Sequence, residues 1–174
     1  MLGIWSALRV AALTATVLLA GCALIAPYDA TYDQSLNKFS EDTAKFTASA
    51  AAGGPERSFG SKESTSYYAA AYNLLDRLSQ RARLSRALVP CPSDASLKAF
   101  SQQSTSTSSL PEDYNQFDCR EFQLYAVRFY VDQLKFAHKA EGGLVPGRVR
   151  IVGGQLQTAI MGAIQTFIVN KTSS

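Results

Sequence analysis

The sequence predicts an all-α protein, a four-helix-bundle-like domain with one long loop. Apolar residues recur at steps of three and four in four separate segments, and no segment has a convincing strand pattern. Short turns rich in Gly and Pro separate most of these segments. Up-down-up-down connectivity is therefore expected, with residues 91–118 as the one long excursion.

The first helix is predicted to start where Asp29 or Thr31 can cap it and to end at Gly53-Gly54-Pro55. The stretch 23–28 before it is broken by Pro27 and is too short for an element of its own. Steps of four and three place one mostly apolar stripe on a single helix face, formed by Tyr32, Leu36, Phe39, Thr43, Phe46 and Ala50.

The second helix can open at Ser61 or Ser64 and should stop before Val89-Pro90-Cys91-Pro92, because proline disfavours helical geometry in the residue before it. Its predicted main stripe is Tyr67, Ala71, Leu74 and Leu78, with Tyr68, Leu75 and Ala82 beside it.

Residues 91–118 lack a sustained apolar helical pattern. They contain a Ser/Thr run at 104–109 and one possible short helix near 95–102. The stretch is predicted to be a loop. Such polar runs are usually plain connections, although long loops also carry binding residues.

Cys119 to Lys139 is the strongest helical pattern, and Gly142-Gly143 should end it. Being apolar on two faces, it is expected at the centre of the bundle. A third, solvent-facing stripe is predicted from Glu121, Arg128, Asp132, Lys135 and Lys139, with Arg128 and Asp132 paired at i, i+4. The two apolar stripes are Leu124, Val127, Val131, Leu134 and His138, and Phe122, Ala126, Phe129 and Phe136.

Ile151 to Asn170 contains no charged residue, and helical spacing relates Leu156, Ile160, Ala163 and Phe167. A buried bundle helix is the favoured interpretation. A self-association face is a smaller possibility, and a membrane span is disfavoured by five Gln and Thr side chains and three glycines.

The N-terminus has the layout of a secretory signal: one cation, Arg9, then the apolar run 10–19 and small residues. Leu19-Ala20-Gly21-Cys22 resembles the lipobox of bacterial lipoproteins. The resemblance implies cleavage before Cys22 and lipid on its thiol; Ala23, rather than aspartate, then favours the outer membrane of a Gram-negative cell. The alternative is an uncleaved transmembrane helix over 10–26, which would be short for a span.

These boundaries divide the chain into a cleaved signal (1–21), a short tether (22–28), one helical domain (29–170) and a tail (171–174). Only one of the 17 basic residues, Arg9, lies in the signal, so 16 remain against 14 acidic residues. This small excess argues against nucleic acid as a partner. The expected partners are the bilayer and another envelope protein.

If Cys22 carries lipid, Cys91 and Cys119 are the only possible intramolecular pair in an oxidising compartment, and a disulfide is predicted. Two reactive or metal-binding thiols are the alternative, but no partner cluster accompanies them.

The sequence contains no recognisable catalytic motif, and His138 is its only histidine. Because His138 lies near the end of a predicted helix, capping or packing there is its favoured role. No metal or cofactor is predicted.

One basic cluster, Arg77, Arg81, Arg83 and Arg86, is a possible partner surface, although interaction with the carbonyls at the end of the second helix is favoured. The expected function is a non-enzymatic envelope lipoprotein that binds a protein or supports an assembly. The alternatives are a sensor or carrier of a small apolar ligand and, more distantly, a cell-wall hydrolase.

Overall fold

The computed structural model describes residues 29–86, 116–140 and 142–172 of the chain. Within these ranges the fold is all-α, as predicted, and no strand occurs beyond an isolated bridge between Ser58 and Gly143. The four long helices are α2 (Ala30–Ala51), α3 (Lys62–Leu84), α5 (Cys119–Ala140) and α7 (Gly154–Thr172).

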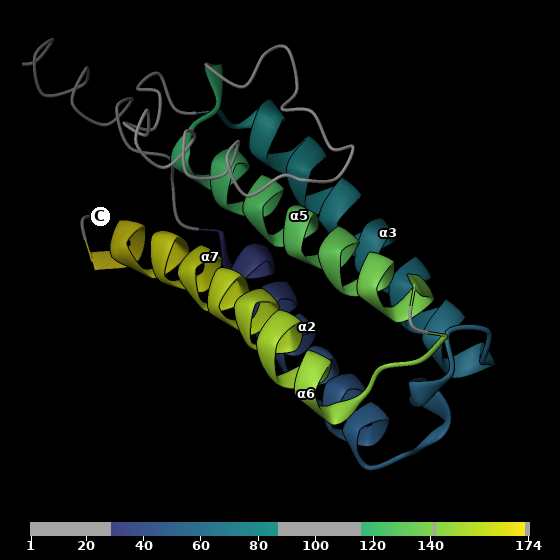
Figure 1. Ribbon diagram of the computed structural model, residues 1–174. Helices are drawn as coiled ribbons and strands as arrows, with labels where there is room; N and C mark the ends of the chain where they lie inside the picture. The colour runs from purple at the N-terminus through teal and green to yellow at the C-terminus, as the bar shows by residue number, and fades with distance from the viewer. Residues whose placement is uncertain (1–28, 87–115, 141, 173–174) are drawn as a thin grey trace, which may run out of the picture.

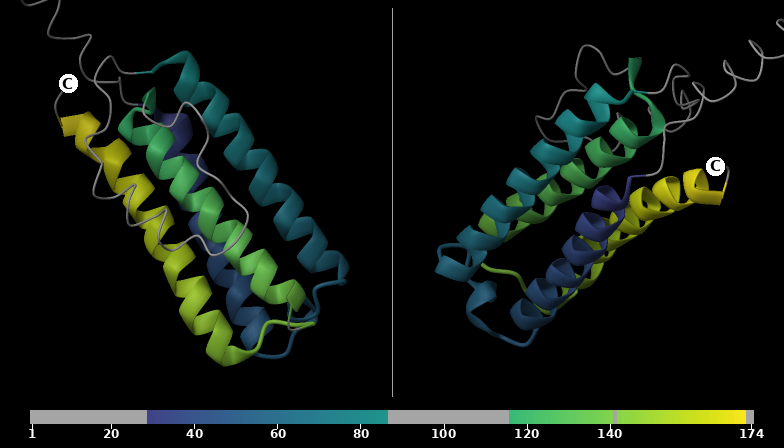
Figure 2. Two further views of the ribbon diagram at one scale, coloured as in Figure 1. Left: turned by 45° about the horizontal axis from the view of Figure 1, so that its top comes forward. Right: turned by 180° about the vertical axis from the view of Figure 1, so that it is seen from behind.

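Consecutive long helices run in opposite directions, and α7 packs against both α5 and α2 (Figures 1 and 2). The helices therefore form a bundle with two distinct ends. We call the end with Asp29, Ser85 and Asp118 the N-terminal end, because α2 starts there. The opposite end, with the connections 52–61 and 142–145, is the turn end.

Helix α2 starts and packs as its sequence predicts. The Asp29 carboxylate accepts a hydrogen bond from the backbone N–H of Thr31 at 2.9 Å, which caps the helix. Beyond its last residue, Gly53 adopts a φ of +86°, which favours glycine. All six residues of the predicted stripe are buried: Tyr32, Leu36, Phe39, Thr43, Phe46 and Ala50.

Helix α3 is capped by Ser61, whose hydroxyl accepts a hydrogen bond from the backbone N–H of Ser64 at 3.0 Å. Its core face is rotated from the predicted one: Tyr67 and Leu74 are only half-buried, because they lie at the seam with α2. The core is instead filled by residues from both expected stripes, with Ser64 beside them: Tyr68, Ala71, Leu75, Leu78 and Ala82.

Helix α5 is central, and its first predicted stripe is fully buried. On the second stripe, the prediction that Phe136 is buried is wrong, because this residue is 63% exposed. The connection between α2 and α3 contacts the face of His138, which lies roughly 200° around the helix from Phe136. Phe136 is therefore left uncovered.

The predicted pair of Arg128 with Asp132 is also wrong. Arg128 pairs with Asp76 of α3, and Asp132 accepts a hydrogen bond from the Tyr72 hydroxyl at 2.7 Å. Because α3 lies alongside α5, cross-helix partners compete with the weak i, i+4 pair.

The last helical segment starts earlier than expected and is continuous with α7 in Figure 1. It comprises α6 (Pro146–Arg148), a π-helical turn η3 (Val149–Gly153) and α7. Gly153 permits close packing on α2, since a Cβ at this position would lie 3.2 Å from Thr47. As predicted, Leu156, Ile160 and Ala163 are buried, whereas the side chain of Phe167 is outside the description.

No helix in the described ranges has the length and apolar character needed to cross a bilayer. This includes α7, for which a membrane span was an alternative. The expected signal at 1–21 and the alternative span at 10–26 lie outside the described residues.

Candidate functional site

Three of the four arginines predicted as a possible partner surface lie close to carboxylates of other helix ends. Arg81 pairs with Asp29 at the start of α2. Arg86 donates two hydrogen bonds of 2.7 Å to Glu121, and Arg83 Nε lies 3.8 Å from the same carboxylate. Three of the four arginines thus hold the ends of α2, α3 and α5 together.

The fourth arginine, Arg77, lies one turn earlier on α3, in a cleft of about 250 Å³ between α2 and α3. The apolar part of this cleft is formed by Phe39, Tyr67 and Leu74. The Tyr67 ring stacks on Phe46, with centroids 3.9 Å apart, and its hydroxyl lies 2.9 Å from the Thr43 hydroxyl. Arg77 is therefore separate from the polar contacts at the N-terminal end.

Glu121, expected on a solvent-facing stripe, is only 4% exposed. It forms a reciprocal cap with Asp118: the Asp118 carboxylate accepts from the Glu121 N–H at 3.0 Å, and the Glu121 carboxylate accepts from the Asp118 N–H at 3.2 Å. This is the capping-box arrangement, and the acidic residues three positions apart before an apolar helix were the signal for it.

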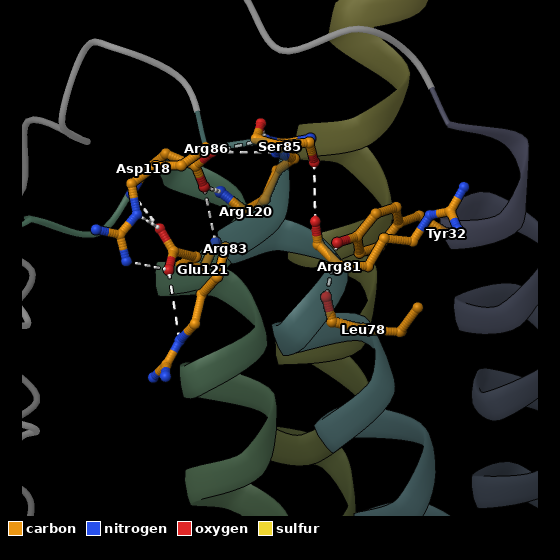
Figure 3. A network of polar contacts seen from close by, with 9 residues as sticks. All are labelled: Tyr32, Leu78, Arg81, Arg83, Ser85, Arg86, Asp118, Arg120 and Glu121. Atoms are coloured by element: carbon orange, nitrogen blue, oxygen red, sulfur yellow. Dashed lines mark hydrogen bonds and ion pairs between the residues drawn. The ribbon is translucent and has the colours of Figure 1, made fainter.

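Arg120 is a further buried charge that sequence reasoning missed. Its guanidinium donates to the Asp118 carboxylate at 2.8 and 3.2 Å and also to the backbone carbonyl of Ser85. Both side chains are only 3% exposed. Since Ser85 follows α3 and Asp118 precedes α5, these bonds join the two chain ends that flank residues 87–115 (Figure 3).

Two contacts attach the start of α2 to this cluster. The Tyr32 hydroxyl donates to the Leu78 carbonyl at 2.6 Å, and burial raises the pKa of Tyr32 so that the hydroxyl keeps its proton. Partial burial opposes ionisation of Asp29, but hydrogen bonds from Arg81 and Thr31 outweigh it and lower the pKa of the carboxyl. We call Asp29, Arg81, Arg83, Ser85, Arg86, Asp118, Arg120 and Glu121 the polar clasp; Figure 3 shows all of these residues except Asp29.

His138 lies at the turn end, and its ring is fully buried. Nε2 donates to the Arg57 carbonyl at 3.0 Å, and Nδ1, 3.0 Å from the Tyr68 hydroxyl, accepts from it. Burial lowers the pKa of the imidazole, partly opposed by the bond to Arg57. Both ring nitrogens are thus engaged in holding the 52–61 connection on α5 and α3.

A third feature is an open groove of about 650 Å³ between α5 and the η3–α7 segment. Ala126 and Tyr130 line it from α5, and Thr158 and Gly162 line it from α7. Apart from Arg150, every side chain of its wall is uncharged. Ile151, on the same wall, is 56% exposed, and Met161 of α7 is 44% exposed. This face can receive an apolar surface without burying charge.

Cys22 and Cys91, two of the three cysteines with predicted roles, lie outside the described residues, and Cys119 is the first residue of α5. The disulfide and the lipid anchor therefore remain predictions. In the described ranges, no three His, Cys, Asp or Glu side chains are grouped so that they could hold a metal ion.

The class that this geometry defines is an all-α bundle with a polar clasp at one end and an open groove along one side. Comparison with family models, curated proteins and solved structures gave no match that would place the chain in a family.

Proposed function

We propose that this protein is a non-enzymatic envelope lipoprotein, anchored by lipid on Cys22, whose helical bundle binds another protein or supports an assembly at the membrane. The proposal that the bundle binds a partner rests on the groove between α5 and α7. In it an exposed apolar side chain, Ile151, lies in a wall that is uncharged except for Arg150, and Met161 of α7 is exposed as well.

The proposal that lipid on Cys22 anchors the chain rests on the resemblance of Leu19-Ala20-Gly21-Cys22 to a lipobox. Helix α2 begins at Ala30, only eight positions after Cys22. A bundle that follows its anchor so closely stays near the bilayer. If the anchored membrane is an outer membrane, as Ala23 favours, the groove faces the periplasm.

The groove is a better candidate partner surface than the arginine cluster. Arg81, Arg83 and Arg86 already have intramolecular carboxylate partners, and a protein ligand would have to compete with them. The groove is also lined by Gly154, where an added Cβ would meet no atom within 4 Å, so a partner can approach the start of α7 closely.

Two other functions are less well supported. A carrier of a small apolar ligand needs an interior cavity, yet the middle of the bundle is filled by fully buried side chains such as Leu36, Leu75 and Ile160. A hydrolase would need a reactive group in reach of substrate, and His138 is buried with both nitrogens engaged.

Site-specific photo-crosslinking in intact cells tests the proposed surface. A photoreactive residue at Thr158, exposed in the groove, should form one discrete adduct, whereas the same residue at Ala44, exposed on α2, should not. Ile151→Arg should weaken the adduct at Thr158 by placing a charge in the groove. An adduct of twice the chain mass would identify a second copy, and another mass a partner protein. Equal adducts from both positions, or none, would contradict the proposal.

A further inference from the structure

We propose that the N-terminal end of the bundle docks on an anionic lipid surface, with Leu84 at the bilayer interface and the exposed Arg81 and Arg83 against the headgroups. This inference rests on the proposed lipid anchor at Cys22. It assigns the bundle an end-on orientation, which anchoring alone does not require.

Leu84 is the first observation. It is the last residue of α3, at the N-terminal end, and its side chain is 90% exposed. No other large hydrophobic side chain of the described residues is as exposed; the next is Phe136, at the turn end, with 63%. An isolated exposed leucine is ordinary on a surface, but this one lies between basic residues of the same helix end.

The arrangement of charge around Leu84 is the second observation. The side chains of Arg81 and Arg83 are 52% and 56% exposed, whereas the carboxylates that they face, on Asp29 and Glu121, are 20% and 3% exposed. Arg81 and Arg83 are therefore the exposed cations of the clasp, whereas Arg120 is buried and Arg86 is 29% exposed. Apolar and basic side chains side by side match an anionic membrane surface.

The length of chain before Asp29 is the third observation. Seven residues from Cys22 to Tyr28 precede it, and even fully extended they reach no more than about 25 Å. Residues 23–26 are all apolar, so an extended tether in water is disfavoured. A lipid on Cys22 thus keeps the end that carries Leu84, rather than the turn end, within reach of the bilayer.

Tryptophan fluorescence tests the docking directly. The chain has one tryptophan, Trp5, which lies before the predicted cut, so Leu84→Trp would be the only fluorophore of its kind in the mature acylated protein. Phe136→Trp is the matched control, an exposed position at the turn end. Both variants are reconstituted, lipid anchor included, into vesicles containing phosphatidylglycerol with brominated acyl chains.

In these vesicles the L84W variant should lose about half of its emission, as expected for a side chain buried 5–10 Å into the interface, while F136W keeps its emission. With vesicles of brominated phosphatidylcholine alone, the quenching of L84W should fall about twofold, because Arg81 and Arg83 then face no anionic headgroups. Equal quenching of the two variants, or no dependence on anionic lipid, would overturn the proposal. Shielding of L84W in native membranes but not in vesicles would also overturn it, in favour of a protein partner.

Mass spectrometry of the same samples separates the two proposals. Acylated protein whose L84W variant is unquenched refutes only the docking. A mature protein without acyl chains refutes the anchor itself.

Discussion

Arg86 donates one hydrogen bond to each carboxylate oxygen of Glu121, both at 2.7 Å. The two residues are 35 positions apart and stand on either side of the connection between α3 and α5. Bidentate pairing of this kind has a defined geometry as well as a favourable energy. It joins the end of α3 to the start of α5 through two side chains.

Glu121→Gln should destabilise the bundle by about 1–3 kcal/mol, because Arg86 and Arg83 lose the charge of a buried partner. Chemical denaturation followed by circular dichroism measures this free energy of unfolding. Glu63→Gln, at an exposed position in the first turn of α3, is the control and should cost only tenths of a kcal/mol. Equal effects of the two changes would show that the clasp does not stabilise the fold.

Gly143→Ala and Gly147→Ala should have opposite effects. A Cβ on Gly143 would lie 2.8 Å from the Arg57 carbonyl oxygen, so the alanine should lower the melting temperature, at a cost of about 1–3 kcal/mol. Gly147 is in a helical turn with no atom within 4 Å of an added Cβ, and alanine there should stabilise by a few tenths of a kcal/mol up to about 1. Destabilisation of equal size at both positions would contradict the close packing at Arg57.

His138 predicts a pH dependence of stability. Its pKa is lowered in the folded protein, so the unfolded chain takes up the proton first as the pH falls. The stability that neutral His138 contributes is present at pH values above its ordinary pKa of 6.5 and is lost progressively as the pH falls below that value. Because it is the only histidine, His138→Asn should flatten the unfolding free energy between pH 8 and pH 5. An unchanged slope in this variant would assign the dependence to other groups.

Apolar periodicity predicted the helices because it reports one-sided burial, and α2 shows this most clearly. A single face of α2 meets the rest of the bundle, so its six-residue stripe and its Asp29 cap are both local patterns. Helix α3 was predicted less well. It packs on two neighbours unequally, and the angle between them, which turns Tyr67 toward the seam, is not encoded in one helix.

The polar clasp escaped prediction for a related reason. A run of arginines at a helix end has the same pattern whether it faces solvent or long-range partners. Glu121 is distant in sequence from Arg86, and Arg120 is buried against Asp118 and the Ser85 carbonyl. Only the packing of α3 against α5 brings these groups together.

The predicted disulfide between Cys91 and Cys119 is tested by alkylating the purified protein before and after reduction. Two thiols should become reactive only after reduction. Replacing both with serine should lower the free energy of unfolding by about 3.5 kcal/mol, as the chain-entropy relation gives for a loop of this length. Alkylation of both cysteines without reductant would refute the bridge and leave the α3–α5 connection to the clasp alone.

The central claim, that the chain is anchored by lipid, is tested most directly by the intact mass of the protein purified from membranes of cells that acylate lipoproteins. A mature chain that begins at Cys22 and carries the added mass of a diacylglyceryl group, absent from a Cys22→Ser variant, is the predicted result. A chain that retains Met1 to Gly21, or that begins at Cys22 without added mass, would contradict it.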